Sequence, residues 1–147
     1  MRETEARMKI RELFALRKLG VVATRGEEYP YTSLVGFVPT EDLGAIVFAT
    51  LKNTRKYSNL MEDPRVTLLV NSASGSAGDF ENAFSVTVLG EASVARKEQE
   101  AVLRELYLSK LPFLEEFIND PDCALVQIKP VKFIVVNGLR AVSAFDA

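Results

Sequence analysis

The sequence contains no histidine, and it has a single cysteine, Cys123, among its 147 residues. Without histidine the chain cannot form a Ser-His-Asp or Cys-His catalytic unit, a histidine-ligated zinc site or a histidine-ligated haem. One cysteine excludes an internal disulfide and a thiolate metal cluster. We therefore predict no metal site, and we expect Cys123 to be a small buried hydrophobe. Any redox or group-transfer chemistry at neutral pH is expected to come from a bound organic cofactor.

The chain also lacks a strong excess of charge of one sign and long apolar runs. Its formal net charge is −2, and its basic residues are scattered apart from the pair Arg55–Lys56, which argues against a nucleic-acid-binding surface. No apolar run approaches the roughly 20 residues of a membrane span. The N-terminus lacks the apolar core of a signal peptide. We therefore expect one cytoplasmic domain over residues 1–147, with no nucleic-acid or membrane partner.

The pattern of apolar residues predicts a chain made mainly of strands with a few short helices. The expected helices cover Thr4–Leu19, closed by Gly20 as a left-handed cap, then Thr54–Glu62, Lys97–Lys110 and Leu111–Asn119. The expected strands cover Val21–Thr24, Tyr31–Val38, Ala45–Ala49, Val66–Asn71, Phe84–Val94, Ala124–Ile128, Lys132–Val136 and, weakly, Ala141–Ala144.

Three details of the connections add to this prediction. Gly90 is a possible β-bulge within its strand, and Lys129–Lys132 reads as a charged edge hairpin. The Ser/Ala/Gly-rich segment Ser72–Gly78 has little to order it, so we expect mobility or ligand-dependent order there. The first strands are joined by turns too short for parallel crossovers. An antiparallel sheet of six or seven strands with so few covering helices is expected to close on itself.

The strongest functional signal lies between Ala49 and Arg65. Both Asn53 and Thr54 are plausible N-caps for the helix that follows, because their side-chain oxygens can accept bonds from its free N–H groups. Arg55 and Lys56 come directly after them, where cations oppose the helix dipole. Free N–H donors, a hydroxyl, a guanidinium and an ammonium would together suit a phosphate. The same residues also fit a solvated charged turn.

The order of elements and several segments resemble the FMN-binding split-barrel family related to pyridoxamine 5′-phosphate oxidase. The resemblance runs from about Leu19 to Asn137 and is most specific between Val47 and Val70, where the matching residues are Thr50, Thr54–Lys56, Asn59–Leu60, Asp63–Val66 and Leu68–Leu69. It implies a mainly β, antiparallel split barrel of six to seven strands with short helices. It also implies a homodimer with the flavin at the interface, so that the second chain completes each site.

The resemblance assigns candidate cofactor-binding residues. Thr54, Arg55 and Lys56 would hold the FMN phosphate, in agreement with the helix-start argument, and Asn53 stands directly before them. Thr50 resembles the position that contacts the isoalloxazine ring. The backbone of Ser33, Leu34 and Val35 would supply N–H and C=O groups along the ring.

The chain departs from the oxidase at positions that matter for its substrate. Ser33 stands where the oxidase has an arginine on the flavin phosphate, Val38 where it has a lysine, and Leu111 where it has a substrate-binding arginine. Tyr107 matches its substrate-phosphate tyrosine, although packing of a ring at the barrel rim explains Tyr107 as well. The arginine- and tryptophan-containing C-terminal segment has no counterpart. We therefore do not expect pyridoxamine 5′-phosphate oxidase activity.

No residue reads as a dedicated catalytic acid or base, so the catalytic residues are not identified. We expect an FMN-dependent oxidoreductase that acts on a small substrate stacked on the flavin. The alternative is a non-catalytic flavin-binding or flavin-sensing protein, or one that holds a deazaflavin or haem in the same cleft.

Overall fold

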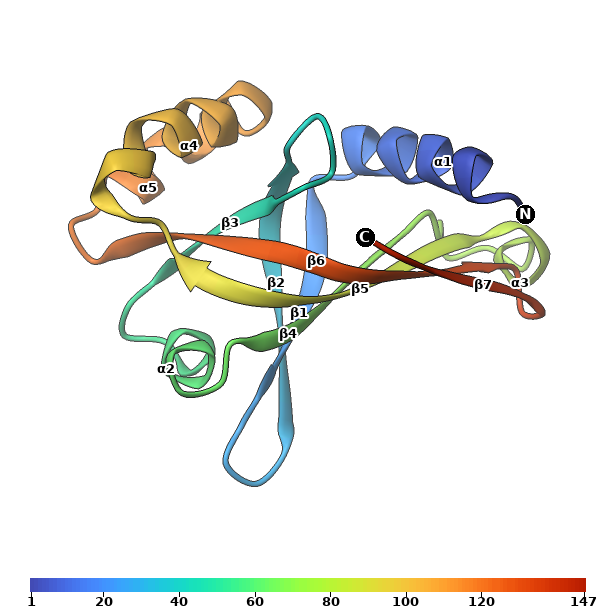
Figure 1. Cartoon of the computed structure of the whole chain (residues 1–147), viewed down its shortest axis with the longest axis horizontal. Helices are drawn as coiled ribbons and strands as arrows, with labels where there is room; N and C mark the ends of the chain where they lie inside the picture. The colour runs from blue at the N-terminus through green and yellow to red at the C-terminus, as the bar shows by residue number, and fades with distance from the viewer.

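Every strand pairing in the computed structural model, which describes residues 1–147, is antiparallel (Figure 1). The strands are β1 (Leu19–Arg25), β2 (Pro30–Pro39), β3 (Ile46–Leu51), β4 (Arg65–Asn71), β5 (Phe84–Val94), β6 (Cys123–Asn137) and β7 (Ala141–Asp146). They lie in the order β3-β2-β1-β4-β5-β6-β7, and an additional pairing of β3 with β6 closes the first six into a barrel. The predicted antiparallel barrel is confirmed, with β7 as an extra strand.

Strand β6 is where the structure departs most from the prediction. We expected two strands separated by a charged hairpin at Lys129–Lys132, and this was wrong, because β6 runs unbroken from Cys123 to Asn137. Its first part pairs with β3 and its last part with β7, while β5 follows its other edge. The ladder between β5 and β6 shifts register between Leu89 and Gly90, opposite Pro130. This irregularity, predicted at Gly90, accommodates a proline that cannot donate to the ladder.

Helical segments precede and connect the strands. They are α1 (Glu3–Leu16), α2 (Arg55–Glu62), α3 (Asp79–Asn82), α4 (Lys97–Lys110), the 3₁₀ turn η1 (Pro112–Leu114) and α5 (Glu115–Asn119). Helix α1 buries Ile10, Leu13 and Phe14 in the barrel core, and the Phe14 ring meets Phe37 edge-on with centroids 5.3 Å apart. None of the helices combines the length and the hydrophobicity that a transmembrane helix requires.

Helix α1 ends earlier than predicted. It stops at Leu16, and Arg17 has extended backbone angles, so Gly20 is not a left-handed helix cap. Gly20 instead lies in β1, where a Cβ atom would come within 3.0 Å of the Leu68 side chain. The glycine therefore allows close packing of β1 over β4.

A second, smaller core lies between the barrel and helices α4 and α5. Strand β3 faces the barrel interior on one side and this second core on the other, so residues Ile46–Thr50 are all buried. Cys123 is only partly buried at the edge of the second core, a weaker burial than predicted. The site described below lies where β3 ends.

The segment between β4 and β5 has more order than its composition suggested. The Asp79 carboxylate accepts hydrogen bonds from the backbone N–H groups of Ser74 and Gly75, at 3.0 and 2.7 Å. These bonds lower the pKa of Asp79. This interaction was not predicted, because Asp79 lies just beyond the Ser/Ala/Gly-rich run.

Candidate functional site

Helix α2 begins with a threonine cap. Thr54 has extended backbone angles (φ −100°, ψ 156°), and its Oγ1 accepts a hydrogen bond from the Tyr57 N–H at 3.3 Å. The same hydroxyl donates to the Leu51 carbonyl at 2.8 Å. Asn53 is exposed and makes no side-chain hydrogen bond. Of the two candidate caps, Thr54 is the one used.

The Lys56 ammonium and two threonine hydroxyls lie close together at the start of α2. The Lys56 Nζ donates to Thr50 Oγ1 at 3.1 Å, and the Thr50 and Thr54 hydroxyl oxygens lie 3.0 Å apart. Thr50 is fully buried at the end of β3. Burial lowers the pKa of Lys56, and no carboxylate forms an ion pair with it. A bound anion would supply the missing countercharge.

Arg55 points to a different part of the surface. It is exposed and lines a hollow of about 340 Å³ together with Asn59 and the β1–β2 hairpin, residues 26–31. It takes part in no ion pair. The neighbouring cations Arg55 and Lys56 therefore line separate hollows within one chain.

The Lys56 side chain lines an apolar cleft of about 390 Å³. One wall is β2, and the opposite wall is formed by η1 and α5. The lining residues are Lys18, Leu19, Leu34, Val35, Gly36, Ala49, Lys56, Tyr107, Leu111, Phe113, Leu114 and Phe117. β2 pairs with β1 along residues 30–36 but with β3 only at Phe37–Pro39, so one edge of residues 30–36 has no strand partner. Unpaired backbone groups on that edge are available to a ligand.

Two side chains of α4 fasten this helix to β2 behind the cleft. Tyr107 is buried, and its hydroxyl donates to the Gly36 carbonyl at 3.0 Å. Burial raises the pKa of Tyr107 to about 12, which keeps the hydroxyl protonated. The Lys110 Nζ donates to the carbonyls of Phe14 and Phe37 at 2.7 and 2.9 Å, and burial lowers its pKa to about 8. Both groups hold α4 in place.

The eight candidate residues thus fall into three groups. Leu34, Val35 and Lys56 line the cleft, while Thr50 and Thr54 join Lys56 through hydrogen bonds. Arg55 lies in the neighbouring hollow, and Asn53 and Ser33 are outside both.

The Ser33 Oγ is buried without a hydrogen-bond partner, and nothing in the structure explains it. The aromatic wall of the cleft was not predicted from the sequence. Phe113 and Phe117 are four residues apart, a spacing that would have placed them on one side of a helical segment.

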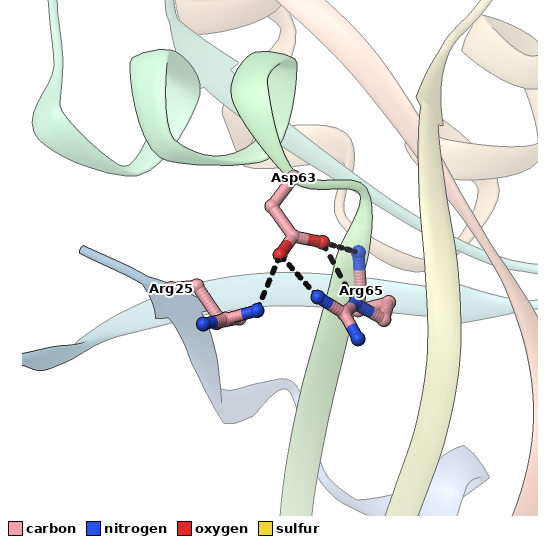
Figure 2. A network of polar contacts seen from close by, with 3 residues as sticks. All are labelled: Arg25, Asp63 and Arg65. Carbon is pink, nitrogen blue, oxygen red and sulfur yellow. Dashed lines mark hydrogen bonds and ion pairs between the residues drawn. The ribbon is translucent and has the colours of Figure 1, made fainter. Parts of the chain in front are cut away.

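A second polar cluster lies at the other end of α2 (Figure 2). The Asp63 carboxylate accepts from Arg25 at 3.0 Å and from Arg65 at 2.8 and 3.0 Å, and the backbone N–H of Arg65 donates to it at 3.1 Å. The side-chain bonds from Arg65 hold the pKa of Asp63 well below its usual range. Both arginines line a wide hollow of about 710 Å³. Here each arginine shares the Asp63 carboxylate.

Comparison with known proteins identifies the family of this chain. A family model described as pyridoxamine 5′-phosphate oxidase matches residues 6–137. The chain belongs to the pyridoxamine 5′-phosphate oxidase family. A search among curated protein sequences finds no match.

Several solved structures share the fold at low sequence identity. A heme binding protein from Mycobacterium smegmatis superposes with a TM-score of 0.82 at 21% identity over 92% of this chain, which spans 55% of that protein's length. A protein from Clostridium acetobutylicum, described as related to general stress protein 26 of B. subtilis and of the pyridoxinephosphate oxidase family, gives 0.77 at 17% identity, over 99% and 96% of the two chains. A FAD-binding protein from Mesorhizobium loti gives 0.66 at 13% identity, over 94% and 90%. These similarities establish the fold.

Proposed function

We propose that this protein binds FMN and is an oxidoreductase that acts on a small substrate stacked on the flavin. The observation that carries the proposal is the Lys56 ammonium, which is half-buried, bonded to Thr50 and without a carboxylate partner at the mouth of an apolar cleft. A half-buried cation without a countercharge is costly unless an anion binds beside it. A cofactor with a phosphate and a flat ring suits both parts of this site.

The residues present fit FMN. Thr54, Lys56 and the first N–H groups of α2 would hold the phosphate, with Arg55 approaching from the adjoining hollow. Thr50 and the unpaired edge of β2 at Leu34 and Val35 would hold the ring. The bound flavin would supply hydride and electron transfer, and the protein would position it and exclude water.

We further propose that the protein works as a homodimer with the flavin at the interface. The support is an apolar strip on the outer face of the sheet. Leu34 pairs with Val21, and Val21 with Leu69, so their side chains share that face. Leu34 is 66% exposed and Leu69 36% exposed. An uncovered strip of this kind is typical of an interface between identical subunits.

The second candidate is a protein that binds a flavin, deazaflavin or haem without catalysis. It is favoured by the similarity to structures named as heme-binding and FAD-binding, and by the absence of a carboxylate in the cleft lining that could act as an acid or base. The cleft alone suits either role.

Titration of the purified protein with FMN and with riboflavin tests the proposal. We expect FMN to bind much more tightly, because riboflavin lacks the phosphate, and we expect a solution mass near twice that of the chain. A colourless monomer that ignores FMN at tens of micromolar would refute both parts. Anaerobic mixing of the FMN-loaded protein with NADH or NADPH then separates the candidates: bleaching of the flavin and its reversal by an acceptor support an enzyme, and a flavin that neither nucleotide reduces supports the binding protein.

A further inference from the structure

The wall of the cleft opposite β2 is built from apolar side chains that remain open to solvent. Phe113 is 65% exposed and Phe117 36% exposed, although both line the cleft. Leu111 closes its inner end and is buried. Covering such side chains with a ligand removes apolar surface from water, which stabilises the complex by about 25 cal/mol per Å².

No polar group on this wall is free to bind a substrate. The Tyr107 hydroxyl is taken by the Gly36 carbonyl, and the Lys110 ammonium is directed to the carbonyls of Phe14 and Phe37. The charged residues of the lining are Lys18 and Lys56, and no carboxylate lines the cleft. In the proposed flavoprotein, Lys56 serves the cofactor phosphate. Lys18 is exposed and directly precedes β1, so η1 and α5 themselves offer only shape and stacking as means of recognition.

Resting on the proposed function, we infer that the substrate is a flat, apolar aromatic compound that stacks against Phe113 and Phe117. A phosphate placed against Phe113 and Phe117 would lose part of its hydration without gaining a hydrogen bond from them. An aromatic ring at the same place gains apolar contact and edge or face contacts with the two phenylalanines.

Calorimetric titration of the FMN-loaded protein with two probes tests this inference. The first probe is 2,3-dimethyl-1,4-naphthoquinone, which has no free ring position for addition by Cys123, and the second is pyridoxine 5′-phosphate, which has no aldehyde to react with lysine. We expect the quinone to bind and the phosphate ester to bind at least tenfold more weakly. Tighter binding of pyridoxine 5′-phosphate would overturn the inference.

Two matched variants locate the site. Phe113→Ala should weaken quinone binding about fivefold, because one stacking ring is lost. Phe80→Ala is the control, since Phe80 lies in α3 outside the cleft and is 64% exposed, nearly the same as Phe113. Equal effects of the two substitutions would overturn the inference.

The same titrations on flavin-free protein separate this inference from the proposed function. Tight FMN binding without a Phe113-dependent quinone site would overturn the inference alone. Failure to bind FMN would overturn the proposed function alone, provided that the flavin-free protein still binds the quinone through Phe113.

Discussion

Cationic side chains lie at both ends of helix α2, but they are unpaired at its start and paired with a carboxylate at its end. At its start, Arg55 and Lys56 have no carboxylate partner, and Lys56 is half-buried against Thr50. At its end, Arg25 and Arg65 share the carboxylate of Asp63 on an exposed surface. Both ends join the helix to a strand of the same barrel, so the local fold does not explain the difference.

We interpret the unpaired cations at the start of α2 as available to a ligand and the paired arginines at its end as stabilising the fold. Unpaired cations in the first turn oppose the helix dipole and lower stability, a cost that is offset when an anion binds. A carboxylate that is paired with two arginines partly neutralises both cations, so this cluster offers little to an anionic ligand. Substitutions at the start of α2 should therefore change cofactor affinity, and substitutions at its end should change stability alone.

The largest effect is expected from Lys56→Met, which removes the ammonium and keeps the length of the side chain. FMN affinity should fall about 10- to 100-fold, because a charge-assisted and partly buried interaction is lost. Riboflavin affinity should hardly change. Fluorescence titration measures both. The control is Lys97→Met, since Lys97 is also a cation in the first turn of a helix but is exposed and lies outside the cleft. An unchanged FMN affinity in the Lys56 variant would place the phosphate elsewhere.

The next effect is on the folding of α2. Thr54→Ala removes the cap that the Tyr57 N–H uses and should lower the free energy of unfolding by about 1 kcal/mol. Urea denaturation of the flavin-free protein measures this change. Asn53→Ala is the matched control, because Asn53 is the exposed neighbour without a side-chain hydrogen bond. An equally large loss in the free energy of unfolding for Asn53→Ala would show that Thr54 is not the cap.

The features that could be predicted from sequence are those set by near neighbours. The Thr54 cap follows from a hydroxyl directly before a helical segment, and antiparallel closure follows from turns too short for crossovers. The continuity of β6 could not be predicted, because Pro130 is accommodated only by the irregularity at Gly90 on another strand.

The composition of the site depended even more on distant contacts. Arg55 and Lys56 point to different sides because they are adjacent in a helix, but the hollow that each one lines depends on the β1–β2 hairpin and on the packing of η1 and α5. The Arg25–Asp63 pair joins residues 38 positions apart. Local patterns contain no signal for such pairings.

A smaller effect on affinity is expected from Arg55→Met. Because Arg55 is exposed and lines the neighbouring hollow, its contribution is screened by solvent, and FMN affinity should fall only about two- to fivefold. The same titration as for Lys56→Met gives the comparison. A loss larger than that caused by Lys56→Met would show that Arg55 turns toward the phosphate in the dimer and would reverse the ranking of the two cations.

The smallest effect is expected from Asp63→Asn, since the ion pairs that it breaks are exposed. The bonds from Arg65 lower the pKa of Asp63 in the folded state below its ordinary value of 3.8. A depressed carboxylate pKa contributes stability that is fully present above the unfolded-state pKa and is lost as the pH falls toward the folded-state pKa. The parent should therefore melt at a slightly higher temperature than the variant at pH 7, and the difference should shrink below about pH 4.

Thermal melts from pH 7 to pH 3 check this dependence, with Asp122→Asn as a control at an exposed carboxylate that has no ion pair. FMN affinity at pH 7 should be the same in parent and Asp63→Asn variant, because Asp63 lies outside the cleft and the Arg55 hollow. A difference in melting temperature that stays constant with pH would mean that Asp63 acts through packing. A loss of FMN affinity would mean that the end of α2 belongs to the binding site after all, and the contrast between the two ends would no longer hold.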